Sequence, residues 1–154
     1  MSDWKRRTQE VAIDALPAQA REAVERHIEQ YNLGPILLDV LMCIQTESEK
    51  VKKGLFGKAE SVQMTVILTP RWLLWSVDQP NKNTAVLSAQ LIHITVQDYS
   101  QTPFAKLIPD SGVEVSGMFT DASEPASLFI GLEESAAGQA FRQSLIRATA
   151  DAKK

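Results

Sequence analysis

The chain has 154 residues, 44% of them hydrophobic, with 16 Lys+Arg against 19 Asp+Glu and a formal net charge of −3. This length forms one domain with a substantial core, and the apolar content excludes an intrinsically disordered chain. A slight acidic excess argues against a duplex-DNA binder, which needs a clear basic excess to contact phosphates. We therefore expect no nucleic-acid partner.

The compartment is predicted from the cysteine count and the hydropathy. Cys43 is the only cysteine, so it has no internal disulfide partner and a reducing cytoplasm is expected. The N-terminal charges lead into Thr8–Gln9–Glu10 rather than the apolar stretch of a signal peptide. The most apolar run, residues 36–44, is about half the roughly 20 residues that cross a bilayer. We expect a soluble, cytoplasmic protein.

The first third is predicted to be helical. Pro17 suits the first position of a helix, and Gly34 and Pro35 are expected to end it near residue 32. One face of this helix is apolar at helical spacing, through Ala20, Ala23, Val24, His27, Ile28 and Tyr31. A weaker helical turn or two is predicted around residues 9–16.

The middle of the chain is predicted to form strands. In the segment 62–69 the even positions are apolar and three of the four odd positions are polar, the period of a half-buried strand. Further strands are predicted at 72–77, 112–120 and 126–132, and one between about 40 and 52. The segment 84–97 is long enough to bend or bulge. The predicted total is six or seven strands.

The C-terminal segment is predicted to be a second helix. Ser135 is a suitable N-cap residue. Four apolar residues follow on one face of the helix: Ala137, Phe141, Leu145 and Ala148. A helix, an antiparallel meander and a closing helix together predict an α+β fold in a single domain.

This order of elements resembles the pleckstrin-homology-like (PH-like) superfamily, in which two orthogonal sheets form a partly open barrel and a C-terminal helix closes one end. The segment from Val66 to Trp75 is similar to a hairpin of bacterial PH-like and GRAM-type domains. The resemblance implies a PH-like barrel with its capping helix over residues 36–150, and an N-terminal helical extension over residues 1–35. Many eukaryotic members carry a tryptophan in the last helix, where this chain has Phe141.

Catalytic and metal-binding signatures are missing from the sequence. Cys43 and His93 each lie in an apolar run, where packing is the expected role, and the sequence has no G-x-S-x-G motif. No zinc signature occurs. The acids at 110, 114, 121 and 124 lack the spacing of a calcium loop. We expect no enzyme, no metal and no cofactor.

A basic hairpin is the first candidate ligand-binding feature. Residues 50–58 carry four lysines and no acid, and the resemblance implies that phosphoinositide headgroups bind at this loop. Members that bind phosphoinositides also carry a pair of basic residues on the strand that follows this loop, and the matching segment 61–65 has none. The other interpretation is therefore a solvated hairpin whose lysines prevent edge-to-edge pairing of sheets. The candidate ligand-binding residues are Lys50, Lys52, Lys53, Lys58 and Arg71.

The aromatic residues indicate a different partner. Trp72 and Trp75 are three apart on a predicted strand, so they point to opposite faces and only one enters the core. The other is either covered by the N-terminal helix or exposed as an anchor for a protein partner or a second copy. The candidate partner-binding residues are Leu55, Phe56, Trp72 and Trp75.

These features predict a non-catalytic binding or scaffolding domain that engages another protein or associates with itself. Peripheral binding to anionic lipid headgroups through hairpin 50–58 is the alternative. A small-molecule-binding protein or an enzyme is the third reading, which a pocket lined by His93 and polar neighbours would favour.

Overall fold

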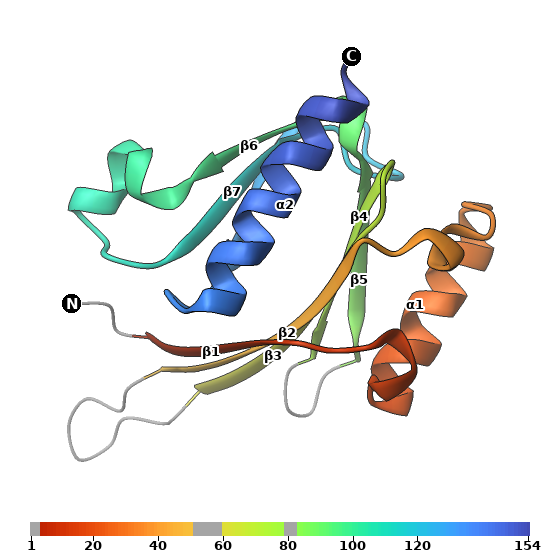
Figure 1. Ribbon diagram of the computed structural model, residues 1–154, viewed down its shortest axis with the longest axis horizontal. Helices are drawn as coiled ribbons and strands as arrows, with labels where there is room; N and C mark the ends of the chain where they lie inside the picture. The colour runs from red at the N-terminus through yellow and green to blue at the C-terminus, as the bar shows by residue number, and fades with distance from the viewer. Residues whose placement is uncertain (1–3, 51–59, 79–82) are drawn as a thin grey trace.

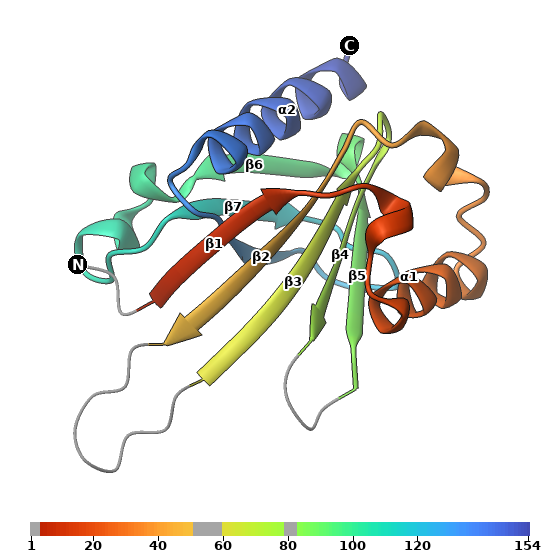
Figure 2. The same ribbon diagram turned by 60° about the horizontal axis from the view of Figure 1, so that its bottom comes forward.

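The computed structural model describes residues 4–50, 60–78 and 83–154, and has an α+β fold (Figure 1). Sheet A has five antiparallel strands in chain order: β1 (Trp4–Glu10), β2 (Met42–Lys50), β3 (Glu60–Leu68), β4 (Trp72–Asp78) and β5 (Ala85–Gln90). Sheet B has three: β6 (Ile94–Asp98), β7 (Gly112–Gly117) and β8 (Ala126–Gly131). The two α-helices are α1 (Ala18–Gln30) and α2 (Ala136–Ala152), and Figure 2 shows the strands of sheet A side by side.

Strand β1 was not predicted. It pairs with β2 along its whole length, from Trp4 opposite Lys50 to Glu10 opposite Ile44. The segment 1–35 therefore contributes a strand to sheet A as well as the predicted helix. Because Arg6 and Thr8 take the inward positions of β1, the strand has no apolar alternation that sequence periodicity could detect. The weak helical turn predicted around residues 9–16 is present as a 3₁₀ turn at Ile13–Ala15, while β1 extends to Glu10.

The predicted segment 84–97 forms two strands. A 3₁₀ turn at Leu91–His93 separates β5 from β6, and β6 belongs to the other sheet. The described residues therefore form eight strands, where six or seven were predicted. Gly117 lies opposite Ile94 with φ of 144°, and a Cβ there would be 2.1 Å from the carbonyl oxygen of His93. A glycine is required because the backbone approaches too closely for any side chain.

The main core lies between sheets A and B and under α2, which contacts strands of both sheets. Trp75 of β4 is 2% exposed, and its ring meets Phe119 edge-on at 5.6 Å between centroids. Phe141 and Leu145, predicted to share one face of α2, are fully buried in this core. The C-terminal helix was predicted correctly because its apolar spacing and its Ser135 cap agree.

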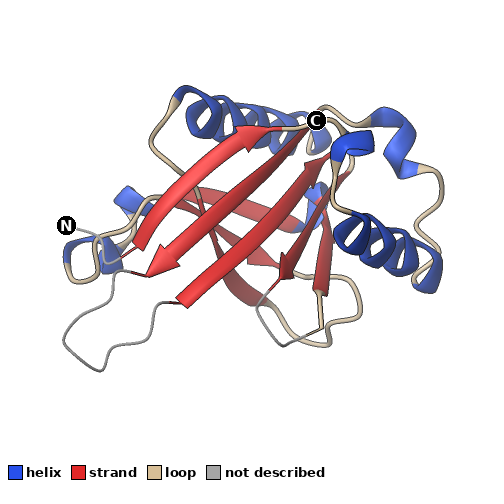
Figure 3. Cartoon of the chain, turned by 90° about the horizontal axis from the view of Figure 1, so that it is seen from below, coloured by secondary structure: helices blue, strands red, loops and turns tan. Residues whose placement is uncertain are grey.

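A second apolar layer covers the opposite face of sheet A. Helix α1 packs on β4 and β5. Figure 3 shows the two long helices on different sides of the strands. Five buried residues form this α1 layer: Leu16, Val24, Cys43, Ile67 and Leu74. Trp72 is half-buried against it. The two tryptophans of β4 therefore lie on opposite faces, as predicted, with Trp75 inside and Trp72 at the helix-covered face.

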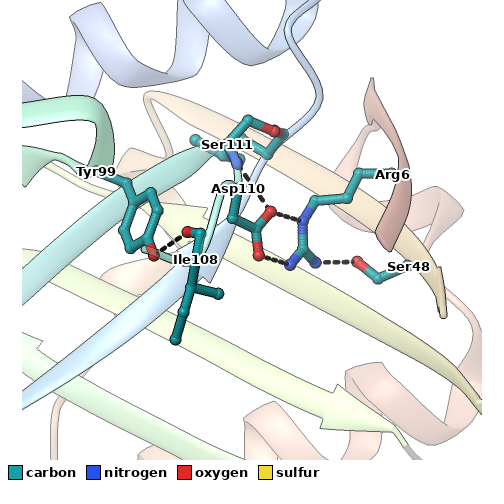
Figure 4. A network of polar contacts seen from close by, with 7 residues as sticks. Arg6, Ser48, Tyr99, Ile108, Asp110 and Ser111 are labelled. Carbon is teal, nitrogen blue, oxygen red and sulfur yellow. Dashed lines mark hydrogen bonds and ion pairs between the residues drawn. The ribbon is translucent and has the colours of Figure 1, made fainter. Parts of the chain in front are cut away.

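The seam between β1 and the end of β8 is closed by side chains, and no ladder joins the two sheets over the described residues. The Thr8 amide donates to Glu133 Oε1 at 3.0 Å, and the Glu133 amide donates to Thr8 Oγ1 at 2.9 Å. Arg6 donates to both carboxylate oxygens of Asp110, at 2.9 and 2.6 Å, and to Ser48 Oγ at 2.6 Å (Figure 4). Arg6 and Thr8 thus connect β1 to residues just before β7 and just after β8, and the described strands form no closed barrel.

Candidate functional site

A hollow of about 450 Å³ opens at the margin of the α1 layer. Its walls are aromatic and polar, and include Tyr31, Trp72, Gln90, His93, Phe119 and Thr120. These residues come from the end of α1, the start of β4, the end of β5, the 3₁₀ turn before β6 and the segment after β7. A concave surface with apolar walls and a few polar groups is the usual form of a binding site, so we treat this Trp72 hollow as the candidate functional site.

The backbone positions Trp72 and its neighbours firmly. The hydroxyl of Thr69 accepts the Trp72 amide at 2.9 Å, which sets where β4 begins after the turn. Trp72 then lies opposite Gln90 in the β4–β5 ladder. The carbonyl of His93 accepts the Met118 amide at 3.2 Å, so the 3₁₀ turn is tied to the segment after β7. The walls of the hollow are therefore held by main-chain hydrogen bonds and are largely preformed.

A buried chain of hydrogen bonds lies beneath the hollow. His27 Nε2 is 2.8 Å from Ser88 Oγ, and Ser88 Oγ donates to Thr120 Oγ1 at 2.6 Å. Because the serine proton goes to Thr120, His27 Nε2 is the donor to Ser88, as assigned from the hydrogen-bond network. Burial lowers the pKa of His27, which keeps the imidazole neutral at pH 7. A serine nucleophile needs the reverse donor arrangement and access to substrate, whereas Ser88 is buried.

The rim of the hollow is closed by Tyr31. Its hydroxyl donates to Asp121 Oδ2 at 3.2 Å, joining the C-terminus of α1 to the segment after β7. Partial desolvation and then the neighbouring Asp121 carboxylate raise the pKa of Tyr31, so the phenol stays protonated and continues to donate. Asp121 has φ of 63°, in the left-handed region that aspartate adopts more readily than most residues.

A second hollow of about 500 Å³ lies beside the first, because Gln90 lines both. It is bounded by Arg71 from the β3–β4 turn, by Ile92, and by Asp151 at the end of α2. Arg71 and Ile92 are exposed. The structure therefore brings the predicted residues Arg71 and Trp72 onto neighbouring hollows of one surface.

The other predicted site residues have different locations. Trp75 is buried in the main core, so Trp72 is the tryptophan of this pair that a partner could contact. Lys50 is exposed at the end of β2, directly opposite Glu60 in the ladder. Five predicted residues lie outside the described residues: Lys52, Lys53, Leu55, Phe56 and Lys58.

Cys43 does not belong to the hollow. It is 3% exposed within the α1 layer, and burial raises the pKa of its thiol to about 12. A protonated, inaccessible thiol is a poor nucleophile. In the described part of the chain no three His, Cys, Asp or Glu side chains gather as metal ligands. None of the helices described there is long and apolar enough to span a membrane.

Sequence reasoning found part of this site. It identified Trp72 as a possible contact residue, and it stated that a deep pocket lined by His93 and polar neighbours would favour a small-molecule-binding protein or an enzyme; the hollow is open, and His93, Gln90 and Thr120 are in its lining. It did not connect Tyr31, Ser88 and Thr120, which lie far apart in the chain and which no motif links. Comparison of the chain with protein-family models, curated proteins and solved structures found no match.

Proposed function

We propose that the protein is a non-catalytic binding domain that engages another protein through the Trp72 hollow. The observation that carries this proposal is the preformed hollow of about 450 Å³ with three aromatic walls, Tyr31, Trp72 and Phe119. Tryptophan and tyrosine in well-packed, concave surroundings are the side chains that contribute most to protein interfaces. A hollow of this size accepts one or two apolar side chains of a partner.

The chemistry around the hollow supports binding rather than catalysis. His27 Nε2 donates a hydrogen bond to Ser88, and the Ser88 hydroxyl donates a hydrogen bond to Thr120. The thiol of Cys43 is buried elsewhere. His93 and Gln90 are exposed at the hollow and are suited to hydrogen-bond a partner's backbone. These groups orient a ligand without any nucleophile positioned to attack it.

The neighbouring hollow extends the proposed contact. Through Gln90 the surface continues to Arg71, the exposed Ile92 and Asp151. The Asp151 carboxylate is paired with Lys154 at 3.0 Å, so a peptide segment that fills the Trp72 hollow would next meet an apolar side chain and the Arg71 cation. Arginine favours an acidic group on the partner at that point. The partner class we propose is a protein segment with an apolar anchor residue followed by an acidic one.

The PH-like assignment is also a proposal. Strands β2 to β5 form a four-stranded meander, β6 to β8 form the second sheet, and α2 packs between the two sheets. This order supports a PH-like arrangement to which β1 and α1 are additions. We also propose a cytoplasmic location, which the single buried cysteine supports.

A photoreactive amino acid placed at Gln90, which lines both hollows, tests the protein-binding proposal. In cells, illumination should give a discrete crosslinked protein species from position 90 and none from the exposed Gln143 on α2. The captured protein, once purified, should lose about tenfold or more in affinity for a Gln90→Arg variant, because a cation then obstructs both hollows. Equal crosslinking from positions 90 and 143 would count against the proposal.

Peripheral binding to anionic lipid through hairpin 50–58 stays the alternative proposal. The supporting observation is that Lys50 is exposed where β2 enters the hairpin, although Glu60 faces it across the ladder. Replacement of Lys52 and Lys53 by glutamate should abolish sedimentation with phosphatidylserine-containing vesicles if this alternative holds, and should leave crosslinking from position 90 unchanged.

A further inference from the structure

An exposed apolar tip lies on the connection between β6 and β7, on the opposite side of the molecule from α1 (Figure 1). We define this tip as residues 103–109. Phe104, Leu107 and Ile108 are 58%, 80% and 64% exposed. Three large apolar side chains are thus exposed within five residues of one loop, and exposed apolar side chains that cluster on a surface are the usual mark of an interaction site.

The tip contains a hydrogen-bonded turn. The carbonyl of Phe104 accepts the amides of Leu107 at 3.0 Å and Ile108 at 2.8 Å. The carbonyl of Ile108 accepts the hydroxyl of the buried Tyr99 at 2.5 Å, as Figure 4 shows. The apolar side chains therefore point outward from a hydrogen-bonded turn, and their exposure is a feature of the fold rather than of a loose loop.

The base of the tip is fastened to sheet A. Asp110 follows the tip directly and accepts two hydrogen bonds from Arg6 of β1 (Figure 4). Both side chains of this pair are largely buried. The Tyr99 ring in turn packs on Phe129 of β8, with 5.0 Å between ring centroids. Contacts to two sheets thus hold the tip in a fixed orientation.

Two acidic side chains next to the tip are paired with arginines, whereas the lysine on the tip has no acidic partner among the described residues. Asp110 is paired with Arg6, and Asp98 faces Arg142 at 3.8 Å while accepting the Ser100 amide. Lys106, by contrast, is exposed among the apolar residues and pairs with no acid in the described ranges. The acids Glu133 and Glu134 line a hollow at the base of the tip, together with Pro109 and Asp110. The tip itself therefore presents apolar side chains and one free cation.

We propose that the 103–109 tip inserts into the interfacial region of an anionic lipid membrane. A convex apolar projection needs a medium that can close around it, and a bilayer interface supplies one. Backbone groups that enter lipid must already be hydrogen-bonded, as the amides of Leu107 and Ile108 and the carbonyl of Ile108 are. Lys106 is placed to reach anionic headgroups while its stem stays with the apolar side chains. Glu133 and Glu134 at the base limit the insertion to the tip.

Sedimentation with vesicles tests the proposal. Wild-type protein should sediment with vesicles of phosphatidylcholine and phosphatidylserine. Leu107→Asp should lower the partition coefficient by about tenfold or more, because a charge replaces an apolar side chain in the interface. Leu38→Asp is the matched control, since Leu38 is 83% exposed on the segment after α1, and should leave binding unchanged. Lys106→Gln should lower binding to these mixed vesicles by about fivefold, and should not change binding to vesicles of phosphatidylcholine alone.

Three outcomes would overturn the proposal. Wild-type protein that sediments no more with vesicles than without them would reject insertion of the tip. Equal losses for Leu107→Asp and Leu38→Asp would show a nonspecific effect of the new charge. Loss of binding only in the variant carrying both Lys52→Glu and Lys53→Glu would place lipid contact at the basic hairpin.

A fluorescent label at the tip provides a second, direct measurement. Leu107→Cys can be labelled selectively because the native Cys43 is buried. An environment-sensitive dye at position 107 should shift its emission to the blue on addition of the mixed vesicles, and be quenched by lipids with spin labels high on the acyl chain. The same dye on a Leu38→Cys variant should not respond. An unchanged emission at position 107 would reject insertion even if the protein sediments.

Discussion

The two faces of sheet A are covered in different ways. The inner face, with the buried Trp75 and Val66, is enclosed by sheet B and α2. The outer face is covered only where α1 lies, and at the margin of that helix Trp72 is half-buried beside a hollow. One strand thus supplies a core residue and a candidate contact residue three positions apart. A sheet can be stabilised through one face while the margin of the other remains available for binding.

The largest expected effect comes from the inner face. Trp75→Ala should lower the free energy of unfolding by about 3–5 kcal/mol, because it leaves a cavity between the sheets and removes the contact with Phe119. Urea denaturation followed by circular dichroism measures this loss. If the destabilisation is no greater than for Trp72→Ala, the difference between the two faces is not real.

The same substitution on the outer face should cost less. Trp72→Ala is expected to lower the free energy of unfolding by about 1–2 kcal/mol, since the side chain is already partly in water. It should nevertheless abolish the crosslink from position 90 if this tryptophan anchors the partner. Retention of the crosslink in a folded Trp72→Ala protein would separate the hollow from partner binding.

The buried His27 makes the outer layer sensitive to pH. Burial lowers the pKa of His27 in the folded state below the ordinary value of about 6.5, so the unfolded chain takes up the proton first as the pH falls. His27 should therefore weaken the fold as the pH drops below about 6.5, and have no such effect above it.

Thermal unfolding at about pH 8 and about pH 5.5 tests this sign. His27→Gln keeps an amide donor near Ser88 but does not titrate, so its loss of stability between the two values should be smaller than that of the wild type. Because His93 and the carboxylates are present in both proteins, their contribution to the pH dependence cancels when the two losses of stability are compared. An equal loss in both proteins would show that His27 does not titrate differently on folding.

The smallest effect is expected on the solvent side of α1. Arg21 donates to Glu25 at 3.1 Å, one helical turn away, and both side chains are substantially exposed. Arg21→Ala should change the free energy of unfolding by at most about 0.5 kcal/mol, and salt should weaken the effect. A loss comparable to that of Trp72→Ala would mean that this face of α1 has a role beyond solvation.

The sequence predicted elements wherever the apolar spacing was unambiguous. The stripe on α1, the face of α2 and the alternation in β3 each matched an element of the structure. Strand β1 escaped prediction because its inward residues, Arg6 and Thr8, are polar and are satisfied by Asp110 and Glu133, more than a hundred positions away. The split of segment 84–97 between two sheets depended on which strands were free to pair with β6.

The candidate site was predictable only in part, for a related reason. Trp72 was noticed because residues three apart on a strand must face opposite ways. The hollow itself needs Tyr31, Gln90 and Thr120 together, and their proximity follows from α1 crossing β4 and β5 and from the return of the chain after β7. The apolar tip had no sequence signal, since Phe104, Leu107 and Ile108 look the same in a chain whether they are buried or exposed.

By itself, then, the sequence determined the α+β class, the two helices, most strands, and the separation of Trp72 from Trp75 onto opposite faces. Periodicity decides these, because it follows from the local geometry of a helix or a strand. Only the tertiary structure decided that β1 joins sheet A, that a hollow forms beside Trp72, and that the 103–109 tip is left uncovered. Each of these depends on contacts between residues distant in the chain, which the pattern around any one residue does not contain.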